Sequence, residues 1–229
     1  VVASFRLTCA IDDNGVTCWG KALGGVTEVP ILSNPVQIGL GHIHACAVSD
    51  NGVTCWGNNG GGRATVPTLS MPTQVSAGGN GHSCSVDSIG VQCWGDNDFG
   101  QVSVPALSNP RLVSAGADHS CAIDDNGVQC WGNSADGRNA VPELSNPVHV
   151  AAGGFNTCAI DDNGVKCWGK KLFGTTAVPL LTMDLDGDGL NDHAGVGLWI
   201  APIDKIVAVE PNYDLDLKFK VANSFMFDI

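Results

Sequence analysis

The sequence predicts an all-β protein built from five copies of a repeat of about 37 residues. Ten cysteines form five pairs whose members stand nine residues apart, and each second cysteine is followed directly by Trp-Gly. A proline preceded by valine stands eleven residues after each of these tryptophans. An internal period of about 20–50 residues is typical of propellers, solenoids and other arrays. The chain of 229 residues is long enough to bury a core across such an array.

Each copy of the repeat reads as three short strands, as the fifth copy illustrates. Residues 148–152, 157–160 and 165–168 are rich in β-branched and aromatic residues and alternate as strands do. Between the last two strands, Asp161-Asp162-Asn163-Gly164 predicts a tight turn in which the glycine supplies a positive φ. The second and fourth copies carry Ser49-Asp50-Asn51-Gly52 and Asp124-Asp125-Asn126-Gly127, and the third carries the divergent Asp87-Ser88-Ile89-Gly90, which keeps the glycine.

The predicted hairpin accounts for the spacing of the cysteines. Counting outward from the turn places Cys158 opposite Cys167, and opposed residues on antiparallel strands lie about 4.5–5.5 Å apart at Cα, which a disulfide tolerates. Zinc binding is the competing interpretation, but zinc-ligand pairs usually stand about two to four residues apart and four ligands must converge. The predicted disulfides are Cys9–Cys18, Cys46–Cys55, Cys84–Cys93, Cys121–Cys130 and Cys158–Cys167. Paired cysteines indicate an oxidising compartment, so we expect a secreted or cell-surface protein.

Composition narrows the classes of partner. The net charge is −12 and charged residues make up only 15% of the chain, whereas hydrophobic residues make up 44%. Such an acidic chain is a poor match for nucleic acid or anionic lipid, which need clustered Lys and Arg. No apolar run approaches the roughly 20 residues of a membrane helix, so membrane insertion is not expected. The chain opens at Val1 without an initiator Met, which indicates a mature or fragmentary chain.

The repeat resembles a known family. Residues 116–133 (Gly-x-x-His-Ser-Cys-Ala-Ile-Asp-Asp-Asn-Gly-Val-Gln-Cys-Trp-Gly-Asn) resemble the regulator-of-chromosome-condensation repeat, and residues 96–101 carry that family's loop after the tryptophan. The resemblance covers about residues 1–183 and implies a β-propeller, which in this family usually has seven blades. The short period is similar to a compact bacterial version, a secreted β-lactamase-inhibitor propeller. The cysteine pairs and the count of five clear copies depart from the family pattern.

We therefore divide the chain into repeats at 1–183, a loop or linker at 184–192 and a β-rich segment at 193–229. Residues 195–199 (Gly-Val-Gly-Leu-Trp) resemble part of the repeat, so this segment is either a degenerate sixth blade or the start of another β element. Alternating patterns predict strands at 207–209, 215–221 and 225–227. The apolar end at Ile229 indicates truncation or a strand that pairs with another chain, giving an oligomer.

The segment between these parts resembles a calcium loop of the EF-hand or thrombospondin type-3 kind. Carboxylates at alternate positions surround a hard cation, glycine at position 6 allows a sharp turn, and position 7 offers its carbonyl. Position 12 is Gly195 instead of the Glu of a full EF-hand, which favours the thrombospondin-like version. The alternative is an acidic, glycine-rich linker without an ion. The expected ligands of Ca²⁺, the one cofactor predicted, are Asp184, Asp186, Asp188, Leu190 through its carbonyl, and Asp192.

Two sets of recurring side chains are interpreted as structural. His44, His82 and His119 stand two residues before a cysteine, and we expect them to bond backbone groups between blades, the alternative being a metal or catalytic site. The five tryptophans are expected to pack between blades instead of forming a ligand cage. No combination of nucleophile, base and orienting group is visible, so no catalytic residue is predicted and the protein is not expected to be an enzyme.

The loops after Trp-Gly vary while their surroundings repeat, and variable loops on a rigid scaffold are where a binding surface is expected. Drift in unconstrained loops is the alternative. The candidate binding residues are Lys21, Leu23, Asn58, Arg63, Asp96, Asp98, Phe99, Asn133, Asp136, Arg138, Lys170, Lys171 and Phe173.

The sequence thus predicts a secreted or cell-surface, non-enzymatic binding or structural module. An adhesin or extracellular assembly component fits the cysteines, the calcium loop and the apolar end, with a protein partner or a second copy bound. A secreted inhibitor of an enzyme such as a β-lactamase and a glycan-binding lectin are the alternatives. Nucleotide exchange, the role of the eukaryotic family, is disfavoured because the cysteines indicate an oxidising compartment.

Overall fold

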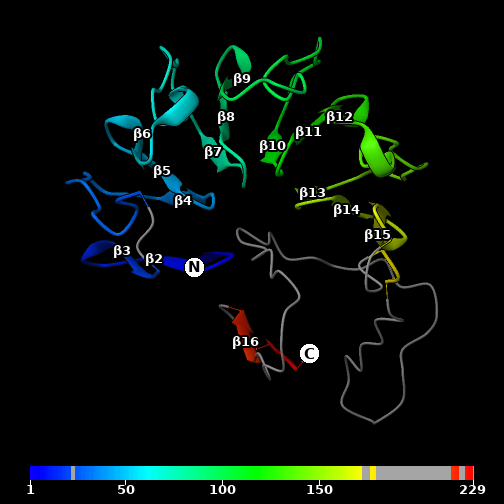
Figure 1. Ribbon diagram of the computed structural model, residues 1–229. Coiled ribbons are helices and arrows are strands. Elements are labelled where there is room, and N and C mark those ends of the chain that lie inside the picture. The colour runs from blue at the N-terminus through cyan, green and yellow to red at the C-terminus, as the bar shows by residue number, and fades with distance from the viewer. Residues whose placement is uncertain (22–23, 172–175, 179–217, 222–224, 229) are drawn as a thin grey trace.

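A computed structural model shows five three-stranded antiparallel sheets arranged as the blades of a propeller around a common centre (Figure 1). It describes residues 1–21, 24–171 and 176–178, together with the backbone of 218–221 and 225–228. Blades 1 and 5 lie at the two ends of the arc that the five sheets form (Figure 1). No helix in the described residues is long and apolar enough to span a membrane.

The blades repeat one another strand for strand. Blade 1 consists of β1 (Val2–Ser4), β2 (Leu7–Asp12) and β3 (Gly15–Gly20), and blade 2 of β4 (Gln37–Leu40), β5 (His44–Ser49) and β6 (Gly52–Gly57). Blade 3 consists of β7 (Gln74–Ala77), β8 (His82–Asp87) and β9 (Gly90–Gly95), and blade 4 of β10 (Leu112–Ala115), β11 (His119–Asp124) and β12 (Gly127–Gly132). Blade 5 consists of β13 (His149–Ala152), β14 (Asn156–Asp161) and β15 (Gly164–Gly169). The 3₁₀ turns η1 (Gly60–Gly62) and η2 (Ala135–Gly137) follow β6 and β12.

The hairpin register is the one that the sequence predicts. In blade 5, Cys158 pairs with Cys167 and Asp161 pairs with Gly164, whose φ is +104°. All ten cysteines form the five predicted disulfides, with Cα–Cα distances of 4.0–4.1 Å, and none is free. The disulfide interpretation is therefore confirmed over zinc binding.

The hydrophobic core lies between the blades. Cys46 of blade 2, for example, packs in one cluster with Val75 and Trp94 of blade 3. The same arrangement recurs at every described interface, because the disulfide of one blade meets the tryptophan of the next. The inner strands are also joined by side chains: Gln37 of β4 donates to the Val75 carbonyl (2.9 Å) and accepts from the Val75 N–H (2.7 Å).

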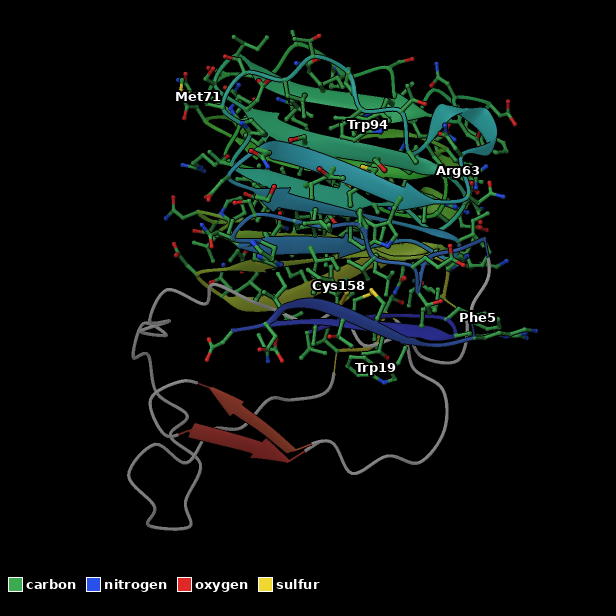
Figure 2. All side chains as sticks on the ribbon, turned by 90° about the vertical axis from the view of Figure 1, so that its left-hand side faces the viewer. Phe5, Trp19, Arg63, Met71, Trp94 and Cys158 are labelled. Atoms are coloured by element: carbon green, nitrogen blue, oxygen red, sulfur yellow. A yellow bond between two sulfur atoms is a disulfide. The ribbon has the colours of Figure 1, made fainter. Side chains whose placement is uncertain are left out.

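The tryptophan expectation holds for four blades and is wrong for the first. Trp56, Trp94, Trp131 and Trp168 are only 7–8% exposed, whereas Trp19 is 49% exposed. Figure 2 shows Trp94 among the stacked sheets and Trp19 at the side of blade 1. The reason is positional, because each buried tryptophan is covered by the preceding blade and no described residue takes that place beside blade 1.

Two C-terminal strands form a separate two-stranded sheet. The strand expected at 215–221 is observed as β16 (Lys218–Val221), and that expected at 225–227 as β17 (Phe225–Asp228). They pair with each other in antiparallel orientation. The expected calcium loop, the strand at 207–209 and the segment that resembles a sixth blade lie outside the described residues.

Candidate binding surface at one end of the propeller

The variable loops and the loops between the first two strands of each blade lie at the same end of the propeller, here called the loop end. Backbone hydrogen bonds join the two loops within a blade, for example from Asn58 N–H to the Ile43 carbonyl (2.8 Å) and from Asp96 N–H to the Gly81 carbonyl (3.0 Å). Blades 1, 4 and 5 make the equivalent bonds from Lys21, Asn133 and Lys170. The five variable loops therefore share one surface.

The opposite end, here called the turn end, carries the hairpin turns and the segments with the sequence Leu-Ser-Asn-Pro or Leu-Ser-Met-Pro. In blade 4 the Asp125 N–H donates to the Ser108 carbonyl (2.8 Å), and the buried Asp124 carboxylate accepts from the Ser108 N–H (2.8 Å). In blade 5, burial raises the pKa of Asp161, but hydrogen bonds from Ser145 and Lys166 outweigh that effect and lower the pKa to about 2. Such carboxylates are structural anchors.

The loop end exposes six of the eleven candidate binding residues that the structure describes. Phe99 is 53% exposed at the loop of blade 3, beside the exposed Asp98. The backbone N–H of Phe99 donates to Oε1 of Gln101 (2.9 Å). Because Gln101 is only 2% exposed, this bond ties the loop of Phe99 to the interior of the propeller. Exposed candidates are Lys21, Asn58, Asp98, Phe99, Asp136 and Lys171, whereas Asp96, Asn133 and Lys170 are half-buried. Leu23 and Phe173 lie outside the described residues.

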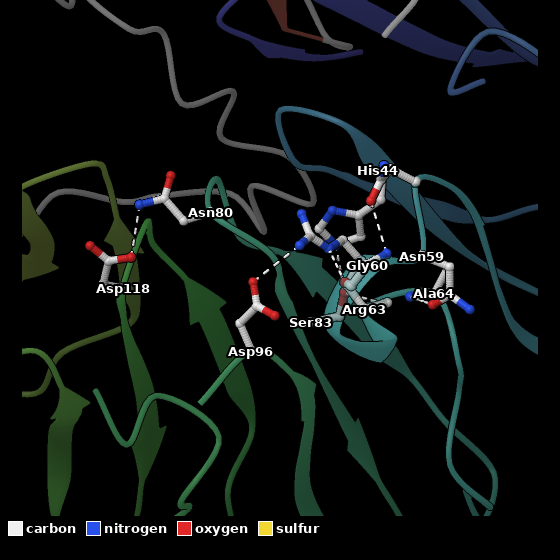
Figure 3. A network of polar contacts seen from close by, with 10 residues as sticks. His44, Asn59, Gly60, Arg63, Ala64, Asn80, Ser83, Asp96 and Asp118 are labelled. Carbon is white, nitrogen blue, oxygen red and sulfur yellow. Dashed lines mark hydrogen bonds and ion pairs between the residues drawn. The ribbon is translucent and has the colours of Figure 1, made fainter. Parts of the chain in front are cut away.

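Two candidate residues, Arg63 and Arg138, lie inside the structure instead of on this surface. Arg63 is 9% exposed; its Nη2 forms an ion pair with Asp96 of blade 3 at 3.1 Å and its Nε donates to the Gly60 carbonyl (Figure 3). Arg138 is 2% exposed and its Nη1 donates to the Gly154 carbonyl of blade 5 (3.4 Å). Both guanidinium groups thus connect one blade's loop to the next blade. The residues that remain available to a partner are the loop tips.

The three recurring histidines connect blades through hydroxyl groups, so the expected backbone partner was wrong. Nε2 of His44 lies 2.9 Å from Ser83 Oγ, and His82 and His119 make the same contact with Ser120 and Thr157. A side-chain hydroxyl of the next blade occupies the position in front of each Nε2 atom, where a backbone group was expected. Each hydroxyl donates onward to a backbone carbonyl, such as that of Gln101 for Ser120 (3.0 Å), so Nε2 carries the hydrogen.

These imidazoles are neutral. Burial and, to a smaller extent, the Arg63 charge lower the pKa of His44 to about 4. Burial lowers the pKa of His82 to about 4, and burial together with the Arg138 charge lowers that of His119 to about 3. Their Nδ1 atoms have no hydrogen-bond partner within the described structure. No group of three or more His, Cys, Asp or Glu side chains that could hold a metal occurs in the described ranges.

Sequence reasoning missed two exposed aromatic rings at the loop end. Phe155 has two cations near its ring, with Arg138 Cζ 5.1 Å and Lys170 Nζ 5.0 Å from the ring centroid. Phe5 has Arg6 Cζ at 4.6 Å from its centroid. The available signal was a phenylalanine in the loop between the first two strands of blades 1 and 5, a residue type that this loop lacks in the other three blades.

Comparison with known proteins agrees with this architecture. Residues 111–138 and 148–174, which cover blades 4 and 5, match the family model "Regulator of chromosome condensation (RCC1) repeat". No curated protein sequence matches the chain. The match supports a propeller of RCC1-type repeats.

Several solved structures are similar. The ectodomain of the receptor kinase CR4 from Physcomitrella patens has a TM-score of 0.64 and 25% identity, over 77% of this chain and 52% of that one. The CRINKLY WD40 ectodomain of the Arabidopsis thaliana receptor kinase ACR4 has a TM-score of 0.59 and 26% identity, over 72% and 65%. Prp20p from Saccharomyces cerevisiae shares the fold at 19% identity, with a TM-score of 0.61 over 72% and 56%. The chain thus spans about half to two thirds of the length of these structures.

Proposed function

We propose that the protein is an extracellular, non-enzymatic binding module that holds a protein partner at its loop end. The observation that carries the proposal is the difference between the two ends of one scaffold. The turn end repeats nearly the same residues and hydrogen bonds from blade to blade, whereas the loop end presents a different set of exposed residues on each blade. Rigid scaffolds with variable loops are a common way to build a binding surface.

The disulfides and the similar structures support the extracellular assignment. Five disulfides form and persist in an oxidising environment, such as that of secreted and cell-surface proteins. Two of the similar structures are ectodomains of receptor kinases. Prp20p has binding properties towards Gsp1p and histones, so a propeller of this fold does hold protein partners in that case.

Phe99 is the residue on which we expect binding to depend most. Large aromatic side chains are enriched where interfaces carry most of their binding energy. The ring is exposed in the free protein, and its loop is held by Gln101 and by Asn97, whose Oδ1 accepts from the Val102 N–H at 3.1 Å. A loop that is already ordered loses less conformational entropy when a partner binds.

The test compares one substitution at each end. Biotinylated protein is used to capture extracellular proteins from the source cells, and each captured protein is then purified and its Kd measured. We expect Phe99→Ala to weaken binding about tenfold or more, because an exposed aromatic anchor is lost. Ile89→Ala, which removes an exposed apolar side chain at the turn end, should leave Kd within about twofold. Binding that is sensitive to Ile89→Ala and insensitive to Phe99→Ala contradicts the proposal.

The class of the purified partner defines the role further. A surface protein or a second copy of the chain corresponds to an adhesin or assembly component, which is the role we favour. An enzyme whose activity falls on binding corresponds to an inhibitor. Capture that free sugar abolishes corresponds to a lectin.

We also propose that Asp184, Asp186, Asp188 and Asp192 bind calcium together with the Leu190 carbonyl. The support is the spacing of carboxylates in the sequence, which matches the ligand positions of a calcium loop. Millimolar Ca²⁺ should slow proteolysis near Asp186 at least several-fold, because an ion stabilises the state that binds it. Asp186→Asn with Asp188→Asn should remove that protection. Equal proteolysis with Ca²⁺ and with chelator shows an acidic linker instead.

A further inference from the structure

One face of blade 1 has the composition of an inter-blade interface but no described neighbour. The register places Thr8 beside Trp19 and Ala10 beside Thr17, so these positions share one face of the sheet. Their counterparts in blade 2, Ala45 and Ala47, are fully buried, whereas Thr8 and Ala10 are half-buried and Trp19 is 49% exposed. We call these residues, with Ala3, the outer face of blade 1.

The contacts between neighbouring blades show which kind of surface packs against a face of this composition. In blade 2, Trp56 is covered by the Leu7 and Cys9 side chains of blade 1, and its Nε1 donates to the Val26 carbonyl at 2.7 Å. Each of the other interior tryptophans also meets apolar side chains of a neighbouring sheet. The outer face of blade 1 is therefore complementary to an apolar β-surface.

The C-terminal hairpin supplies such a surface. The register pairs Phe219 with Phe227 and Val221 with Phe225. Paired positions lie on the same face of a sheet and alternate positions lie on opposite faces, so these four apolar residues share one face. Lys218, Lys220, Met226 and Asp228 share the other. A two-stranded hairpin is marginally stable in water by itself, so its apolar face requires a cover.

We propose that the apolar face of the β16–β17 hairpin packs against the outer face of blade 1 of the same molecule. The 48 residues at 170–217 that connect blade 5 to β16 would reach about 160 Å if fully extended, so length does not prevent the contact. Tethering also gives the hairpin a high effective concentration, of the order of millimolar, at this face. This favours the chain's own hairpin over a second copy. The charged face of the hairpin then remains towards solvent.

Hydroxyl-radical footprinting of Trp19 in the full chain tests this contact. We expect Trp19 to be oxidised slowly, at a rate close to that of the buried Trp94. Phe227→Lys on the apolar face should raise the Trp19 rate several-fold, because the cover is lost. Met226→Lys is the matched control, since it places the same charge one position away on the opposite face and should leave the rate unchanged. Phe99, which lies at the loop end, serves as the exposed reference.

Amide hydrogen exchange of the β16–β17 hairpin provides the reciprocal measurement. Trp19→Lys should increase amide hydrogen exchange across residues 218–228 several-fold, whereas Phe99→Lys should not. The proposal is overturned if Trp19 in the unmodified chain is oxidised as fast as in Phe227→Lys, or if both lysine variants of β17 act alike. It is also overturned if Trp19 protection rises between about 1 and about 100 µM protein, because that dependence identifies a second copy as the cover.

Discussion

The two ends of this propeller are made by the same five sheets, yet they differ in how much the sequence repeats. At the turn end, Asn34, Asn109 and Asn146 each occupy the left-handed region and each donates to an aspartate of the adjacent turn. At the loop end, the equivalent positions of neighbouring blades carry Gly61, Phe99 and Asp136. The comparison teaches that the turn end maintains the fold and that the loop end is free to acquire a binding role.

Acid should lower the free energy of unfolding in two separate pH ranges, one set by histidines near the loop end and one by aspartates at the turn end. This is the largest effect that we expect. The buried histidines near the loop end have folded pKa values of about 4, about 4 and about 3, below the ordinary 6.5. The unfolded chain therefore binds protons first, and stability falls as pH drops from about 6.5 towards 4, by about 3 kcal/mol for each histidine. At the turn end, Asp161 has a pKa of about 2, so its contribution is lost as pH falls from about 4 to 2.

The blade 1–blade 2 interface provides the control for the histidine effect. Leu7 and Ala45 occupy the positions that His82 and Ser120 occupy at the interface between blades 3 and 4. The double variant His82→Leu/Ser120→Ala should therefore reduce the dependence of Tm on pH between 6.5 and 4 by about a third. A slope that does not change would show that these histidines do not control acid stability.

Removing a buried carboxylate at the turn end should have the next largest effect on the free energy of unfolding. Asp124 is fully buried and accepts hydrogen bonds from the Ser108 N–H (2.8 Å), the Asn126 N–H (2.8 Å) and the Gln129 side chain (2.8 Å). Asp124→Ala leaves these donors unpaired, so we expect a loss of about 2–4 kcal/mol in the free energy of unfolding. Asp98→Ala at the loop end should change it by less than about 0.5 kcal/mol. Urea denaturation measures both, and equal losses would refute the division between the ends.

A gain in stability is expected at one irregular position of the turn end. Met71 has a φ of +48°, where the other blades carry asparagine, which adopts this conformation more readily. Met71→Asn should therefore raise the free energy of unfolding by about 0.5–1 kcal/mol. In the other blades this asparagine donates to an aspartate of the adjacent hairpin turn. Blade 3 has Ser88 at the position of that aspartate, so Met71→Asn is not expected to form the same bond. A Tm lower than that of the unmodified protein contradicts this explanation.

The sequence predicts what is local and misses what depends on the next blade. Cys158 and Cys167 lie nine residues apart around one turn, so their pairing follows from counting. The contacts of His44 with Ser83 and of Arg63 with Asp96 join residues 39 and 33 positions apart, and no single repeat contains both partners. For the same reason, five equivalent tryptophans were expected to be buried, although Trp19 has no described blade in front of it.

The candidate surface was predictable in part. Variability around an invariant Trp-Gly identified the loops that carry Asp98 and Phe99. It did not distinguish these exposed tips from Arg63 and Arg138, because a charged residue in a loop ordinarily lies in solvent. Only the position of the neighbouring blade's loop shows that both guanidinium groups are buried.

The central claim is that binding resides in the loop tips and stability in the scaffold, and exchanging one loop for another tests it most directly. Asn97 and Asn59 anchor their loops in the same way, so Asp98→Gly/Phe99→Gly gives the loop tip of blade 3 the two glycines that blade 2 carries there, Gly60 and Gly61. The measurement is the Kd for the purified partner together with Tm, in this variant and in Met71→Asn. We predict that the loop exchange weakens binding about tenfold or more and lowers Tm by no more than about 5 °C, the cost of two added glycines, whereas Met71→Asn leaves Kd unchanged. Undiminished binding after the loop exchange would contradict the account.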